Sequence, residues 1–192
     1  MPLNFDLQKI KDENKCNIYF ETGLWNVLEE DTSLCKALRM DFEKYYSVEI
    51  DSELVKICEK EFPYEIAKNK LTLFEGNSQL LHKYLSSITF EDTDRIIFFL
   101  DSHGHGHGCP LKEELTAIRD MNFKIKPIII LDDVRIIRDC IWSDDRFSTE
   151  RQNHSFEDIL KDMILEIDPN YKFSYLDGYV KDDCLLCSVD VV

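Results

Sequence analysis

The sequence predicts an α/β fold built on a mostly parallel sheet, and two observations lead to that prediction. Short apolar runs rich in β-branched and aromatic residues alternate with longer stretches that have helical spacing. The last two of these runs are separated only by the segment GYVKDD. Alternation of this kind is typical of parallel strands joined by crossover helices, and the short final connection predicts an antiparallel hairpin at one edge. We therefore expect a seven-stranded sheet with helices on both faces.

The expected elements can be assigned in chain order. The strands are NIYFE (17–21), YYSVEI (45–50), LTLFE (71–75), RIIFFLD (95–101), PIIILDD (127–133), KFSYLD (172–177) and CLLCSVD (184–190). The helices are expected at 28–40, 52–62, 78–87, 110–121 and 155–166. Pro110 suits a first helical turn, and Ser155 is a suitable N-cap. The segment 134–154 fits neither pattern, so we expect a long irregular connection there.

Length, composition and charge limit the classes of protein to which this chain can belong. A chain of 192 residues is long enough for one domain over 1–192, and 44% apolar residues predict a globular core. A formal net charge of −15 disfavours a nucleic-acid partner or an anionic membrane surface. No apolar run approaches the roughly 20 residues that span a bilayer. We expect a soluble cytoplasmic protein, and the sequence does not indicate its oligomeric state.

Seven cysteines are scattered along the chain, and buried reduced thiols are the expected state for them. Cys184 and Cys187 form a CxxC motif, but on a strand they would point to opposite faces.

Acidic residues end five of the expected strands: Glu21, Glu49, Glu75, Asp101, and the pair Asp132 and Asp133. In open α/β sheets, ligands bind beyond the carboxyl ends of the strands. Three strand ends fit a nucleoside pocket. Glu21 precedes Thr22 and Gly23, where the chain can turn closely around a ligand; Glu49 stands where an acidic residue binds a ribose; and Asn77 with Ser78 offers polar groups at a helix start.

The other acidic residues predict a metal site. Asp101, Asp132 and Asp133 follow two strands that we expect to be neighbours. Clustered carboxylates raise one another's pKa unless a cation balances them, and hard oxygen ligands suit Mg²⁺, Mn²⁺ or Ca²⁺. Because consecutive strand residues point to opposite faces, Asp132 and Asp133 share an ion only if the strand has ended before them.

The stretch DSHGHGHGCP at 101–110 has two interpretations. His103, His105 and His107 with Cys109 form a candidate zinc or nickel site, but the intervening glycines leave these ligands without a rigid frame. A glycine-rich active-site loop is the alternative that we favour. Within it, His103 lies two residues after Asp101, where neutral imidazole can accept a proton from a substrate.

The succession FETG, YYSVEID, LFEGNS, FFLDSHG, CPLKEEL and IIILDDVR, with the final hairpin, resembles the class I S-adenosylmethionine-dependent methyltransferases. It is most similar to the metal-dependent sugar O-methyltransferases of the macrocin and aminocoumarin type, over roughly residues 17–190. The resemblance implies a Rossmann-like fold, S-adenosyl-L-methionine as cofactor and Mg²⁺ as the divalent cation.

The resemblance also implies roles for single residues. Glu21, Thr22 and Gly23 would face the methionine part of the cofactor, Glu49 the ribose, and Asn77 with Ser78 the adenine. Asp101, Asp132 and Asp133 would hold the cation, and His103 would be the base. The chain departs from the family pattern in two places: Leu24, Trp25 and Asn26 replace glycines of the first loop, and Asn77 replaces the usual aspartate.

The expected activity is therefore methyl transfer to a hydroxyl of a sugar or glycan, with residues 134–154 selecting the acceptor. Three alternatives stay open at this point. The acceptor is a catechol-like phenol, or the chain is a non-catalytic relative that has lost its cofactor, or the histidine ribbon is a metal carrier.

Overall fold

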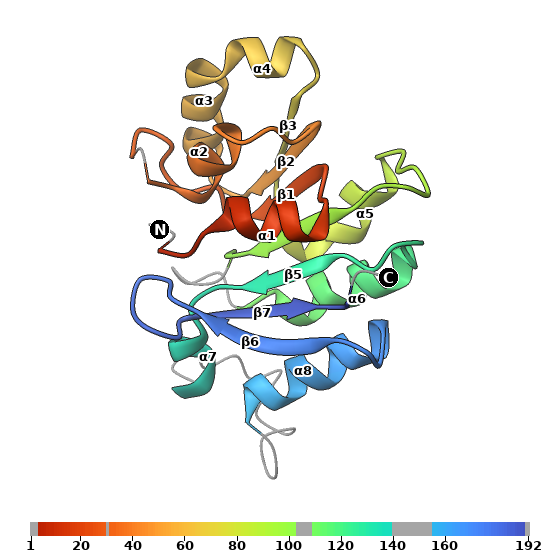
Figure 1. The fold of residues 1–192 in the computed structure, drawn as a ribbon. Coiled ribbons are helices and arrows are strands. Elements are labelled where there is room, and N and C mark those ends of the chain that lie inside the picture. Colours follow the sequence, from red (N-terminus) through yellow and green to blue (C-terminus); the bar gives the residue numbers. More distant parts are fainter. Residues whose placement is uncertain (1–3, 30, 103–108, 140–154, 191–192) are drawn as a thin grey trace.

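The structure, a computed structural model, describes residues 4–29, 31–102, 109–139 and 155–190. Its centre is a seven-stranded sheet in the order β3-β2-β1-β4-β5-β7-β6 (Figure 1). The pairings among β1 to β5 are parallel, and β7 pairs antiparallel with both β5 and β6. The strands are β1 (Ile18–Thr22), β2 (Lys44–Glu49), β3 (Leu71–Glu75), β4 (Ile96–Leu100), β5 (Ile128–Leu131), β6 (Lys172–Leu176) and β7 (Cys184–Ser188). The predicted α/β fold and its final hairpin are confirmed.

Helices cover both faces of this sheet. They are α1 (Leu7–Asn14), α2 (Ser33–Leu38), α3 (Ser52–Glu61), α4 (Pro63–Ala67), the 3-10 turn η1 (Ser78–Leu80), α5 (Leu81–Ser86), α6 (Leu111–Met121), α7 (Val134–Asp139) and α8 (Phe156–Ile167). None of them, within the described part of the chain, is long and apolar enough to cross a membrane.

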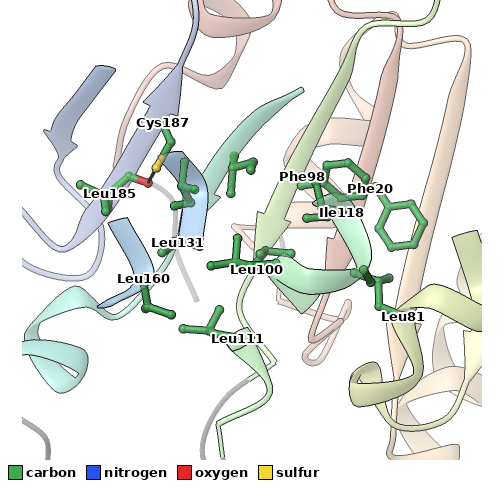
Figure 2. Close-up of a cluster of buried hydrophobic side chains, with 14 of the residues drawn as sticks. Phe20, Leu81, Phe98, Leu100, Leu111, Ile118, Leu131, Leu160, Leu185 and Cys187 are labelled. Atoms are coloured by element: carbon green, nitrogen blue, oxygen red, sulfur yellow. Dashed lines mark hydrogen bonds between the residues drawn. The ribbon is translucent and has the colours of Figure 1, made fainter. Parts of the chain in front are cut away.

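One face of the sheet packs against α5, α6 and α8. Figure 2 shows this cluster, in which side chains from the strands meet Leu81 of α5, Ile118 of α6 and Leu160 of α8. Phe20 and Phe98 belong to this cluster, and their ring centroids are 5.2 Å apart. Successive residues of a strand point to opposite faces of the sheet. Because helices cover both faces here, the strands need apolar residues at every position, as in IIFFL.

The opposite face packs against α1, α2 and α3. Tyr19, Ile97 and Phe99 of the strands form a second buried cluster with residues of these helices, among them Leu7, Ile10, Leu34 and Cys58. The two clusters divide the CxxC pair as expected, since Cys184 belongs to the second cluster and Cys187 to the first. The described cysteines are buried and free of disulfides.

Four helices differ from the prediction. Helix α4 is one of them, because no helix was expected over its residues. Helix α1 was not predicted, because only Leu7 and Ile10 of its residues are buried and two apolar positions in a polar segment give no clear period. Helix α2 is shorter than the expected 28–40. Helix α7 begins directly after Asp133, so the described start of the 134–154 segment is helical and not irregular; residues 140–154 lie outside the described part.

Candidate active site

Several of the predicted site residues lie along the edge of the sheet at which the strand order reverses. Parallel strands β2, β1, β4 and β5 end at the same edge, and β1 lies between β2 and β4. The chain leaves β1 toward α2 on one face and leaves β4 toward α6 on the other, which creates a topological switch point between the two strands. Glu49, Asp101 and Asp132 follow or end three of these four strands, so they lie along one edge of the sheet.

Gly23 brings the loop after β1 against the loop after β4. Its φ is +87°, a conformation that glycine adopts without strain. A Cβ atom at this position would lie 2.3 Å from the carbonyl oxygen of Asp101 and 2.7 Å from its carbonyl carbon. The Gly23 amide donates to Val48 O at 2.9 Å, and the Asp101 amide donates to Thr22 O at 2.9 Å. Glycine is therefore the residue that this close approach of two backbones requires.

Glu49 fixes the next part of the loop after β1 by a hydrogen bond. Leu24 is fully buried, and its amide donates to Glu49 Oε2 at 2.9 Å. The Asp51 amide donates to the other oxygen, Oε1, at 2.8 Å. Trp25 has φ of +55° and 39% exposure, and its indole donates to Glu29 Oε2 at 3.3 Å. Leu24 thus anchors a loop in which the family pattern has glycines.

Glu21 lies in the interior and not at the exposed rim of the edge. Its carboxyl has no exposed surface and accepts hydrogen bonds from Ser33 Oγ at 2.6 Å, Ser47 Oγ at 2.9 Å and Tyr19 Oη at 3.1 Å. Burial raises the pKa of Glu21 to about 7, and the three hydroxyl donors limit that rise. The expected contact of Glu21 with a cofactor stays a prediction.

This buried carboxyl gives the stability of the protein a pH dependence. In the folded protein Glu21 keeps its proton up to a pKa of about 7, against 4.5 for an exposed carboxyl. Between these values unfolding releases a proton, so this contribution to stability is present at low pH and is lost as the pH rises through the window. We expect wild-type protein to lose on the order of 2 to 3 kcal/mol between pH 5 and pH 8 from this source.

Urea denaturation of the wild type and of Glu21→Gln at both pH values isolates the contribution. Glutamine cannot ionise, so the difference between the two proteins should change with pH. A difference that is the same at pH 5 and pH 8 would contradict the assignment.

Thr22 is the other residue of the ETG motif with an unusual environment. It is fully buried, and its Oγ1 has no hydrogen-bond partner among the described residues. A buried hydroxyl without a hydrogen-bond partner costs free energy, so most buried hydroxyls in natural proteins have one.

Asn77 and Ser78 lie at the start of η1. Asn77 Oδ1 caps this turn by accepting from the Gln79 amide at 2.9 Å. Ser78, which is 5% exposed, donates to Ser102 Oγ at 2.9 Å, and Ser102 donates to Glu114 Oε1 at 2.5 Å. This chain of hydrogen bonds joins the loops after β3 and β4 to α6. The sequence did not indicate Ser102 or the buried Glu114, because it shows no contact between residues so far apart.

Three carboxylates meet beyond β5. Asp132, Asp133 and Asp183, hereafter the acidic trio, each offer one oxygen, and these oxygens lie within 4.8 Å of one another. All three residues are buried. Strand β5 ends at Leu131 and Asp133 has φ of +54°, so the alternation of a strand no longer separates Asp132 from Asp133. Asp183, from the β6–β7 connection, was not predicted, and the adjacent acids of KDDC were its only sign in the sequence.

Asp101 lies near the acidic trio without belonging to it. Burial raises the pKa of Asp101 well above its usual range, and the carboxylates of Asp132 and Asp133 raise it further. Strands β4 and β5 are paired, and the Asp132 amide donates to Leu100 O at 3.2 Å, so Asp101 and Asp132 follow neighbouring strands as predicted. Asp183 is nevertheless the third member of the acidic trio.

The histidine stretch lies largely outside the described residues, which omit His103, His105 and His107. Their predicted roles stay predictions. Cys109 is described, and it is 1% exposed within the cluster that faces α5, α6 and α8. A thiol packed in that core is poorly placed to complete a metal-binding ribbon.

No protein-family model matches this sequence, and no curated protein matches it. Solved structures do match. A protein assigned as a caffeoyl-CoA O-methyltransferase from Staphylococcus aureus aligns with a TM-score of 0.58 at 14% identity, over 97% of this chain and 84% of that one. The O-methyltransferase from Bacillus cereus in complex with SAH aligns with a TM-score of 0.57 at 12% identity, over 95% and 78%.

The chain has the class I methyltransferase fold. This fold alone does not decide the reaction. The spermidine synthase from Thermotoga maritima also aligns, with a TM-score of 0.53 at 9% identity, over 94% of this chain and 56% of that one. The reaction has to be inferred from the site.

Proposed function

We propose that residues 1–192 act as a single-domain S-adenosylmethionine-dependent O-methyltransferase. In this proposal the acceptor is a hydroxyl of a sugar or glycan, and a divalent cation, Mg²⁺, assists the transfer. The observation that carries the proposal is the arrangement along one edge of a methyltransferase sheet. There Glu49 ends β2 on one side of β1, and Asp101 and the Asp132–Asp133 pair follow β4 and β5 on the other side.

The residues fit the cofactor. Glu49 already accepts two amide hydrogens, but each carboxylate oxygen can accept a second hydrogen bond, so it can still bind two ribose hydroxyls. The buried Thr22 hydroxyl without a partner lies at the end of β1, beside the loop that would contact the methionine part. Asn77 and Ser78 would contact the adenine. The anchored Leu24 loop would close over these groups in place of a glycine-rich loop.

The residues also fit a hard divalent cation. The acidic trio supplies three buried carboxylates, which is the donor set that Mg²⁺ and Mn²⁺ prefer. A cation bound beside Asp101 would supply the positive charge that lowers the pKa of an acceptor hydroxyl.

The chain's own residues then have defined tasks. The carboxylates orient the acceptor by fixing where a cation can sit, and His103 would take the proton of the hydroxyl. The cofactor-binding residues would align the sulfonium methyl with the acceptor oxygen, which is largely an orientation effect. Residues 134–154 would select the acceptor.

A catechol-type acceptor is the second candidate. The S. aureus protein is assigned as a caffeoyl-CoA O-methyltransferase, and a caffeoyl group carries two phenolic hydroxyls of the catechol type. A phenol loses its proton more easily than a sugar hydroxyl, so it needs less help from a base. Methyl-transfer assays with panels of sugars and of catechols, each with and without Mg²⁺, would distinguish the two acceptors.

Calorimetry with S-adenosylhomocysteine tests the cofactor site itself. We expect wild-type protein to bind it, and Glu49→Gln to weaken binding about 10- to 100-fold, since hydrogen bonds to a charged acceptor are the stronger ones. Glu53→Gln is the matched control, because Glu53 lies four residues further on and its side chain is 75% exposed. An absence of binding at millimolar ligand would instead support a non-catalytic relative.

A further inference from the structure

Arg135 contacts two of the three carboxylates of the acidic trio. Its Nη1 lies 2.6 Å from Asp133 Oδ1 and also forms an ion pair with Asp183 Oδ2. The arginine comes from the first turn of α7, two residues after Asp133. One guanidinium nitrogen therefore pairs with two of the three carboxylates that a divalent cation bound by the acidic trio would use.

The guanidinium and a divalent cation cannot both keep these contacts at full strength. Two positive charges that share the same pair of carboxylates repel each other strongly in a partly buried site. Either cation can neutralise the negative charge of the carboxylates. When one is already bound, the binding of the other therefore yields less free energy.

We propose that Arg135 is a displaceable counter-ion of the acidic trio and thereby sets how tightly a divalent cation binds. This inference rests on the proposed function and adds to it a determinant of metal affinity. In the metal-free protein Arg135 neutralises Asp133 and Asp183. Entry of the cation moves the guanidinium away from the carboxylates.

The structure offers the displaced side chain another contact. Arg135 Cζ lies 5.4 Å from the ring centroid of Tyr179, a side chain that is 61% exposed. A guanidinium over an exposed aromatic face keeps a favourable interaction while its nitrogens turn toward water. Arg135 itself is 34% exposed, so this movement does not require the core to open.

The acidic trio has further supports besides Arg135. The backbone carbonyl of Asp183 accepts from the Val134 amide at 2.7 Å, which joins the β6–β7 connection to the start of α7. Asp132 Oδ1 accepts from the Asp133 amide at 2.8 Å and from the Cys184 thiol at 3.0 Å. These bonds do not involve the guanidinium, so a neutral replacement of Arg135 should leave the three carboxylates together.

The test compares Mn²⁺ and Mg²⁺ binding by calorimetry in Arg135→Gln and Arg135→Lys. We expect Arg135→Gln to bind Mn²⁺ at least about tenfold more tightly than the wild type, because a unit positive charge beside the ion is gone. Arg135→Lys keeps that charge and should stay within about threefold of the wild type. Arg119→Gln is the control, since Arg119 pairs with Asp120 and Glu166 away from this site and should bind Mn²⁺ as the wild type does.

A second measurement covers the case in which Arg135→Gln does not fold. Side-chain ¹⁵N spectra of the arginines in wild-type protein, with Arg135→Lys for assignment, should show the Arg135 signal move on addition of Mg²⁺ while the Arg119 signal stays.

Two results would overturn the inference: folded Arg135→Gln that binds Mn²⁺ no more tightly than the wild type, or an Arg135 signal that saturating Mg²⁺ leaves in place. S-adenosylhomocysteine binding is measured in the same proteins. Its absence would count against the proposed function, whereas normal cofactor binding with unchanged metal affinity would count against Arg135 alone.

Discussion

Replacing Gly23 with alanine should destabilise the protein by on the order of 3 kcal/mol and abolish S-adenosylhomocysteine binding. The added Cβ would lie 2.3 Å from the carbonyl oxygen of Asp101, a backbone atom that cannot turn away as a side-chain tip can. The φ of +87° adds strain for any residue with a side chain. One of the two loops has to move, and these two loops border the switch point.

Urea denaturation and calorimetry measure the two effects. Asn69→Ala is a matched control for the strain alone, because exposed Asn69 also has positive φ, of +52°, in the turn before β3. It should cost about 1 kcal/mol and leave cofactor binding unchanged. If Gly23→Ala proves as stable as Asn69→Ala and still binds S-adenosylhomocysteine, the close approach of the two loops determines neither stability nor cofactor binding.

Replacing Asp132 with asparagine should weaken divalent-cation binding at least about 100-fold and remove metal-dependent methyl transfer. Asparagine keeps an oxygen that can accept from the Asp133 amide and the Cys184 thiol, so the local hydrogen bonds survive. What the variant loses is one negative charge of the acidic trio. Because this charge is buried among others, its removal should leave the free energy of unfolding unchanged or slightly raise it.

Asp177→Asn is the control for Asp132→Asn. Asp177 is exposed at the start of the β6–β7 connection, and its Oδ1 accepts from the Asp182 amide at 3.1 Å. The control should bind Mn²⁺ as the wild type does. Calorimetry with Mn²⁺ is the direct measurement, and equal affinities for wild type and Asp132→Asn would remove the acidic trio from the mechanism.

The fold could be predicted because its central strands, β1, β4 and β5, are buried on both faces. Runs such as IIFFL and IIIL have no polar position, and they alternate with helical periods in the order of a parallel sheet. Helix α1 was not predicted because it contributes few apolar side chains to the core. Its N-cap residue, Asp6, accepts a hydrogen bond from the Lys9 amide, but such local bonds are common in loops as well.

The site could be predicted only as far as strand ends define it. Asp101 and Asp132 were expected together because their strands were expected to be neighbours, and β4 and β5 are. Asp183 and Arg135 entered the same site through the hairpin and the first turn of α7, whose positions depend on tertiary packing. The deep burial of Glu21 was likewise hidden, since its partners Ser33 and Ser47 come from α2 and β2.

Crystals grown with S-adenosylhomocysteine and Mn²⁺ test the central claim most directly. Anomalous scattering from Mn²⁺ should give a peak among the carboxylates of Asp132, Asp133 and Asp183, with the ribose of the nucleoside on Glu49 and Arg135 turned away from the ion. A map without a manganese peak at the acidic trio, and with Leu24 and Trp25 filling the space beside Glu49, would contradict both the cofactor site and the metal site.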